Sequence, residues 1–201
     1  VIGLVLPILM FADIFAIALH WGNWNRRLVL LLIPGAIVGV TIGTFFITNA
    51  PTDTLRKALG VIILLFTIYK IFEKRILRDL AYRPRGWHGL LAGTIAGFSS
   101  ALAHTGGPPI SIYLLFQRIS PAVFIATSAL FFGILNWIKL PYYLYADLFD
   151  WQRLWQIAWL MPLVPIGVWT GKKVSQRFDP QTFENIIVWL LAGSALLLIF
   201  T

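Results

Sequence analysis

One stretch of the chain, Gly97–Pro109 (GFSSALAHTGGPP), gathers side chains that can bind or carry charge within an otherwise apolar region. It contains hydroxyl groups, one imidazole, two adjacent glycines and two adjacent prolines. In a membrane, irregular backbone is tolerated only where its freed N–H and C=O groups face protein or a water-filled cavity. The stretch therefore predicts a broken helix, and the break is the first candidate for a functional site.

The composition of the break predicts a helix N-terminus that faces an anion. Two prolines suit the first turn of a helix that begins near Pro109, and the glycines before them allow close approach. Amides of residues 110–112 and the positive end of the helix dipole would then favour an anion. The alternative is that the hydroxyl groups bond back to their own helix. The candidate substrate ligands in the break are Ser99, Ser100, His104, Thr105, Gly106, Gly107 and Pro108.

Four polar side chains within apolar segments are candidates for binding charge or moving a proton. His104 either binds an anion as imidazolium and takes up a proton, or is a hydrogen-bonded packing residue. Lys139 lies three residues after Asn136, so both share a helix face. Lys139 is either a substrate ligand, with Asn136 beside it, or a lysine that snorkels to the interface. Asp13 either carries a coupled proton or pairs with Lys139.

Catalysis is the weaker interpretation of the same residues. Ser99 or Ser100 could meet His104 on one helix face and form an intramembrane hydrolase, but no oxyanion arrangement is evident. We therefore predict that the protein is not an enzyme and assign no catalytic residue. The chain has no cysteine, which excludes disulfides and cysteine-based metal sites. No metal or other cofactor is expected.

The elements that position these residues are membrane helices. Of the 201 residues, 59% are hydrophobic and 12% charged, whereas soluble domains carry about 25% charged residues. The sequence predicts an all-α polytopic membrane protein. The predicted spans are Val1–Leu19, Leu28–Ile47, Ala58–Phe72, Ala122–Tyr145, Trp151–Gly171 and Thr182–Phe200.

Charge in the connecting loops predicts the orientation. The net charge of +8 lies mostly in short loops, which indicates membrane topology rather than nucleic-acid binding. The basic loop 74–87 is predicted to be cytoplasmic, and the loop with Asp147 and Asp150 to be outside. These assignments agree only if residues 89–117 enter and leave on the cytoplasmic side as a re-entrant element.

An internal repeat divides the chain into two halves. Sliding the sequence by 128 places pairs Pro34 with Pro162, Gly39 with Gly167 and Gly43 with Gly171. With a small shift, Asp13 falls near Asn136. We predict a first repeat over 1–73, whose N-terminal part is missing, the connecting loop 74–87 and a second repeat over 88–201. Each would hold about three full spans and one broken element, which inverts the second copy relative to the first. A second glycine-rich break is expected upstream of Val1.

The run GLLAGTIAGFSSALAHTGGPPISIYLL, followed by SALFFGILNWIKLPYY, resembles the TauE/SafE sulfite exporter family of TSUP-type membrane permeases. The resemblance extends to LPILMFADIFAI and LLIPGAIVGVTIGTFF in the first half. It implies a multi-pass permease of the bacterial inner membrane that moves sulfite, sulfonates or related small organic anions, driven by the proton motive force. A passive anion channel is the alternative. The expected partners are the anion, the lipid bilayer and a second copy in a homodimer, with no nucleic acid.

Overall fold

The computed structural model describes residues 2–49 and 85–179, together with isolated positions at 51, 54, 182–183, 185–186 and 189–190. Across these residues the chain is helical and contains no strand. The predicted span Ala58–Phe72, nearly all of the basic loop 74–87 and most of Thr182–Phe200 lie outside the described residues. The helices are α1 (Ile2–Leu19), α2 (Arg26–Asn49), α4 (Gly86–Ala103), α5 (Gly107–Phe116), α6 (Pro121–Tyr145), α7 (Trp151–Ile157), the 3₁₀ turn η1 (Ala158–Leu160) and α8 (Leu163–Ser175).

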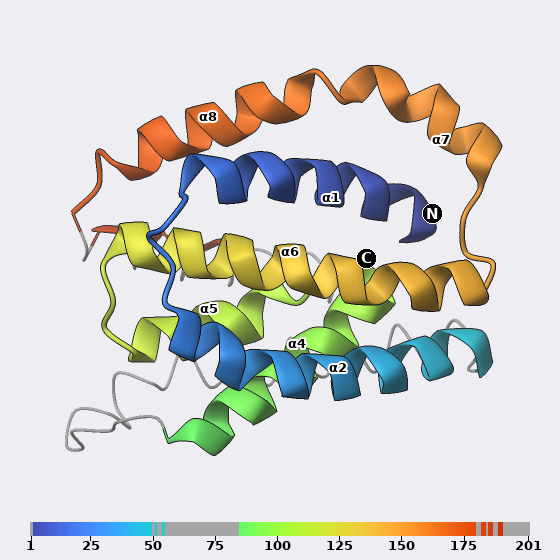
Figure 1. The fold of residues 1–201 in the computed structure, drawn as a ribbon, viewed down its shortest axis with the longest axis horizontal. Helices are drawn as coiled ribbons and strands as arrows, with labels where there is room; N and C mark the ends of the chain where they lie inside the picture. Colours follow the sequence, from blue (N-terminus) through green and yellow to red (C-terminus); the bar gives the residue numbers. More distant parts are fainter. Residues whose placement is uncertain are drawn as a thin grey trace.

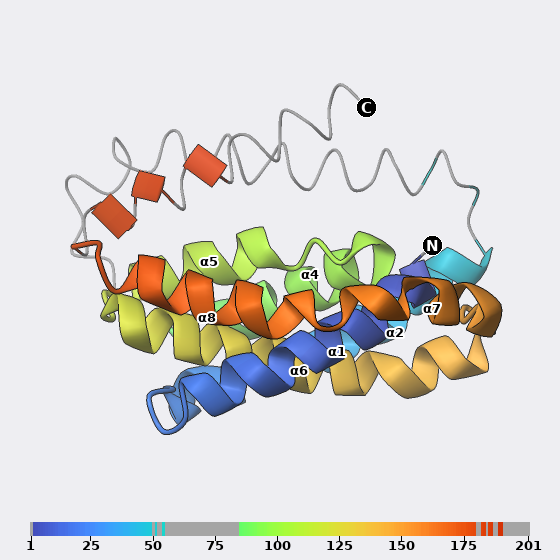
Figure 2. The same cartoon turned by 90° about the horizontal axis from the view of Figure 1, so that it is seen from above.

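Helices α8, α1, α6 and α2 lie side by side in this order (Figure 1). Helix α8 runs in the same direction as α1, whereas α6 and α2 run in the opposite direction. Helix α1 packs against α6 and α8, and α2 packs against α6. Helices α4 and α5 both lie on one face of this layer, as the view from above shows (Figure 2). Helix α4 begins and α5 ends at the same end of the bundle, where α2 and α6 begin.

Two described helices, α2 and α6, are long and apolar enough to cross a membrane. Helix α1 is apolar but shorter. The predicted span Trp151–Gly171 is not one straight helix: the segments Leu154–Leu160 and Leu163–Val174 meet at a bend of 44°, and together they are long and apolar enough for one broken span. Pro162 lies at this bend, where it lacks the N–H that a continuous helix needs and its ring crowds the preceding turn.

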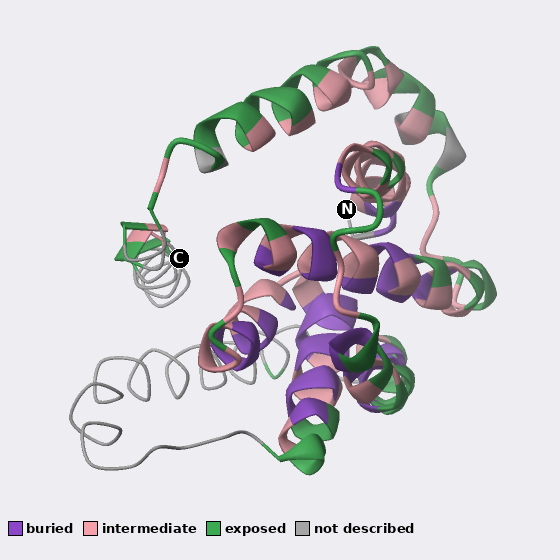
Figure 3. Ribbon diagram, turned by 60° about the vertical axis from the view of Figure 1, so that its left-hand side comes forward, coloured by how far each residue is buried: buried purple, intermediate pink, exposed green. Residues whose placement is uncertain are grey.

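Glycines allow α4 to lie directly on α2. A Cβ atom added at Gly35 would meet the carbonyl oxygen of Leu90, and one at Gly39 would lie 2.7 Å from the backbone nitrogen of Phe98. Close backbone approach through small residues is the usual way in which membrane helices pack tightly. The α2–α4 contact and its continuation into α6 form the buried part of the molecule, whereas the described side chains of α7 and α8 are intermediate or exposed (Figure 3).

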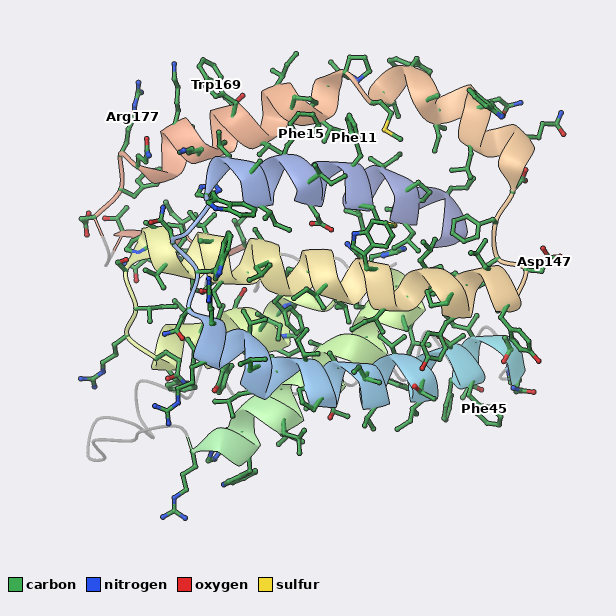
Figure 4. All side chains as sticks on the ribbon, viewed as in Figure 1. Phe11, Phe15, Phe45, Asp147, Trp169 and Arg177 are labelled. Atoms are coloured by element: carbon green, nitrogen blue, oxygen red, sulfur yellow. The ribbon has the colours of Figure 1, made fainter. Side chains whose placement is uncertain are left out.

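The outer surface carries large apolar side chains, as expected of faces that meet lipid. Trp155 is 81% exposed and Trp159 70% exposed on the α7–α8 segment. Charged side chains gather toward the ends of the helices: Arg177 and Asp147 lie at opposite ends of the molecule (Figure 4). This separation is compatible with the predicted orientation, which stays a prediction.

Candidate functional site

The helix break lies where the sequence predicts it. Helix α4 ends at Ala103, and His104 follows in the left-handed conformation with φ 55°. Its backbone N–H donates to the carbonyl of Ser100 at 2.9 Å. Helix α5 begins at Gly107 after Gly106 as N-cap. A Cβ at Gly106 would lie 3.0 Å from Cβ of Ser100, so the start of α5 is packed beside the last turn of α4.

Two of the predicted hydroxyl ligands close the break from within. Thr105 Oγ1 donates to the carbonyl of Ser99 at 3.1 Å. Ser99 Oγ donates to the carbonyl of Ile95 at 2.8 Å and lies 3.3 Å from the carbonyl of Thr105. Both hydroxyls therefore satisfy backbone groups, which is the structural alternative that the sequence left open.

The start of α5 offers fewer amides than the sequence predicted. Because the helix begins at Gly107, the amides of residues 110–112 fall within its regular hydrogen-bond pattern rather than ahead of it. Pro108 and Pro109 occupy the first turn and have no N–H. The expectation of free amides at residues 110–112 is therefore wrong, and the amides at the helix start that lie outside the regular hydrogen-bond pattern are those of Gly106 and Gly107.

Lys139 is the buried cation of the site. Its side chain is 0% exposed, so it does not snorkel to the interface. Its Nζ donates to Ser100 Oγ at 3.0 Å and lies 3.1 Å from His104 Nδ1. Within the described part of the chain, no carboxylate lies within ion-pair distance of Lys139. The ammonium instead lies at the C-terminal end of α4, where the helix dipole favours a positive charge.

The two other predicted polar residues form a separate pair beside Lys139. Asn136 Nδ2 donates to Asp13 Oδ2 at 2.6 Å, between α6 and α1. The Asp13 carboxylate also interacts electrostatically with Lys139 without a direct contact. The structure thus brings His104, Ser100 and Lys139 together, and it links Asp13 to Asn136 one helical turn away along α6.

Tyr143 is a residue of the site that sequence reasoning missed. It is fully buried, and its hydroxyl donates to the carbonyl of Ala101 at 2.7 Å. This carbonyl is in the last turn of α4, where no helical N–H is available. The Tyr143 ring also meets the His104 ring edge-on, with 6.2 Å between centroids. Tyr143 lies four residues after Lys139 on α6, and this spacing could have indicated that the two side chains share a helix face.

Apolar helices long enough to cross a membrane, with a broken helix and a buried lysine packed between them, define a helical membrane protein whose polar site lies inside the bundle. The family model "Sulfite exporter TauE/SafE" matches residues 1–198. The chain belongs to this family, and it is therefore a membrane protein of a sulfite exporter class. No curated protein matches the chain. No solved structure matches it either.

Proposed function

We propose that the chain is a secondary permease for a small anion such as sulfite, a sulfonate or a related organosulfur or organic anion. The observation that carries the proposal is the Lys139 ammonium, which is fully buried and which, among the described residues, is held by a serine and a histidine rather than by a carboxylate. A buried cation in a membrane protein is costly unless it is paired, and such residues mark substrate pathways. An anion that reaches Lys139 would supply a negatively charged partner for the ammonium.

The anion would lie beside Lys139, Ser100 and His104, with the amides of Gly106 and Gly107 close by. Ser99, Thr105 and Pro108 would fix the shape of the break, and Asn136 and Asp13 would border the site on α6 and α1. Transport driven by the proton motive force across the inner membrane fits a site that holds one histidine and one carboxylate.

We infer that 1–73 and 88–201 are inverted repeats joined by the cytoplasmic loop 74–87. A half-turn about the viewing direction of Figure 1 exchanges α1 with α6 and α8 with α2, which supports this arrangement. The hydrogen bond between Asp13 and Asn136 supports it as well, because positions equivalent in two copies touch each other only near a two-fold axis. Alternating access would then come from rocking of one half against the other.

The test is anion flux in proteoliposomes. Lys139→Met should abolish uptake of sulfite and methanesulfonate, because it removes the buried charge and keeps most of the unbranched side chain. Lys173→Met is the matched control: it removes the same charge from an exposed lysine that lies over the Trp169 ring. Equal flux in both variants would contradict the proposal. Flux that does not saturate and ignores a pH gradient would favour a passive channel.

A specific contact favours a second candidate, a hydrolase. Lys139 Nζ and Ser100 Oγ lie 3.0 Å apart, the separation at which a lysine can activate a serine nucleophile. A fluorophosphonate probe that labels wild type but not Ser100→Ala would support it. We favour transport because the family is one of exporters.

A further inference from the structure

The contact between Lys139 and His104 limits the charge that the two side chains can hold together. Nζ and Nδ1 lie 3.1 Å apart, and a hydrogen bond between two nitrogens needs one donor and one acceptor. If Lys139 is an ammonium and donates, Nδ1 carries no proton and the imidazole is neutral. If Nδ1 donates, the lysine is the neutral amine. Every arrangement that keeps this bond therefore leaves one of the two groups uncharged.

In the part of the chain that the structure describes, few other ionisable groups face this pair. Helix α6 contributes Tyr143, whose hydroxyl donates to the Ala101 carbonyl. Helix α1 contributes Asp13, which accepts a hydrogen bond from Asn136. Helix α2 has no ionisable side chain after Arg27. Helix α5 has only Tyr113, whose hydroxyl lies beside Gly89 at the far end of α4. Counted over the described residues, one positive charge on the pair and one negative charge on Asp13 make the resting site close to neutral.

A monovalent anion that enters such a site alone leaves it with a net negative charge, which is costly in a buried environment. A proton added to Nδ1 restores the balance and breaks the Nζ–Nδ1 bond, because two cations then face each other. The N–H of the imidazolium and the released Nζ donor both become available to the oxyanion. The anion and the proton thus each favour the binding of the other.

We propose that His104 and Lys139 act as one charge-sharing pair that takes up one proton when a monovalent oxyanion binds beside them, so that anion and proton are bound and carried together. The inference rests on the proposed anion site and names its coupling group. It assigns the coupled proton to His104, whereas Asp13, hydrogen-bonded to Asn136, supplies the negative charge that balances the pair. A monovalent anion then crosses without net movement of charge.

The experiment is calorimetric titration of the purified full chain with methanesulfonate, in buffers of different ionisation heat. A sulfonate stays ionised near neutral pH, so any proton taken up must come onto the protein. We expect one proton per anion bound and a Kd that weakens about tenfold for each unit of rising pH. His104→Gln offers Lys139 an amide oxygen in place of Nδ1 and cannot be protonated. It should bind with no proton uptake and with a Kd independent of pH.

His88→Gln is the matched control: it removes a histidine from the opposite end of α4, away from the site, and should keep the uptake of one proton. Binding to the wild type without proton uptake would overturn the inference and leave the proposed function standing. Uptake that persists in His104→Gln, or that disappears in His88→Gln, would overturn it as well. Failure of the wild type to bind or transport either sulfite or methanesulfonate would instead overturn the proposed function itself. Thermal melting of each variant in detergent establishes that it is folded.

Discussion

Two glycines related by the sequence repeat should respond in opposite ways to the same substitution. At Gly39 of α2, an added Cβ would lie 2.7 Å from the backbone nitrogen of Phe98 and closer still to the carbonyl of Thr94. At Gly167 of α8, an added Cβ would meet no atom of the described residues within 4 Å. The backbone atoms of α4 can give way at Gly39 only if the two helices move apart.

The magnitude follows from a comparison of Gly39→Ala with Gly167→Ala. Both substitutions replace a glycine within a helix, which by itself favours the helix by about 1 kcal/mol. Overpacking at a well-packed contact costs about 1–3 kcal/mol. Because the helix-propensity gain is common to both, the difference between their free energies of unfolding isolates this packing cost. Gly167→Ala should be neutral or stabilising, and Gly39→Ala should be less stable than Gly167→Ala by about 1–3 kcal/mol.

The assay is unfolding in mixed micelles, with sodium dodecyl sulfate as denaturant, followed by circular dichroism. The midpoint and slope give the free energy of unfolding for wild type and both variants under one condition. Equal changes for the two variants would refute the conclusion that glycine at position 39 is required by helix packing. A destabilised Gly167→Ala would show that α8 is packed in a way that the structure does not show.

Two further predictions concern the break. Tyr143→Phe removes the donor to the Ala101 carbonyl and keeps the ring, so it should lower the free energy of unfolding by about 1–3 kcal/mol, the cost of a buried acceptor without a partner; unchanged unfolding would contradict the capping role. Gly106→Ala should lower the thermal melting temperature, because its Cβ would lie 2.8 Å from the carbonyl of Ala96. Gly107→Ala should melt like wild type, because its Cβ would meet no atom of the described residues within 4 Å. Identical melting of all three proteins would refute this packing.

Local sequence chemistry was enough to predict the helical character and the position of the break. The Gly-Gly-Pro-Pro run leaves two consecutive residues without an amide proton and two without a side chain, and these properties act wherever the chain places them. The same argument predicted that Asn136 and Lys139 share a face. It did not predict the bend within the span Trp151–Gly171, at Pro162.

The partners of the polar residues could not be predicted, because they depend on how each helix is rotated and on what it packs against. Lys139 reaches Ser100 and His104 across 39 and 35 positions of sequence. Asp13 meets Asn136 across 123 positions. Ser99 and Thr105 turned to the backbone of the break, an outcome that composition allows but does not require. Tyr143 could not be predicted as a residue of the site, because a tyrosine near a helix end is common in membrane proteins.

The sequence by itself thus determined where the helix breaks and which polar and charged side chains lie within apolar helices. Only the tertiary structure decided which of them meet, because the glycine-lined contact of α2 with α4 and the packing of α6 fix the distance between the last turn of α4 and Lys139. That distance turns a lysine and a histidine into a pair that shares one charge. Backbone preference is local, whereas the pairing of buried charges depends on packing between helices.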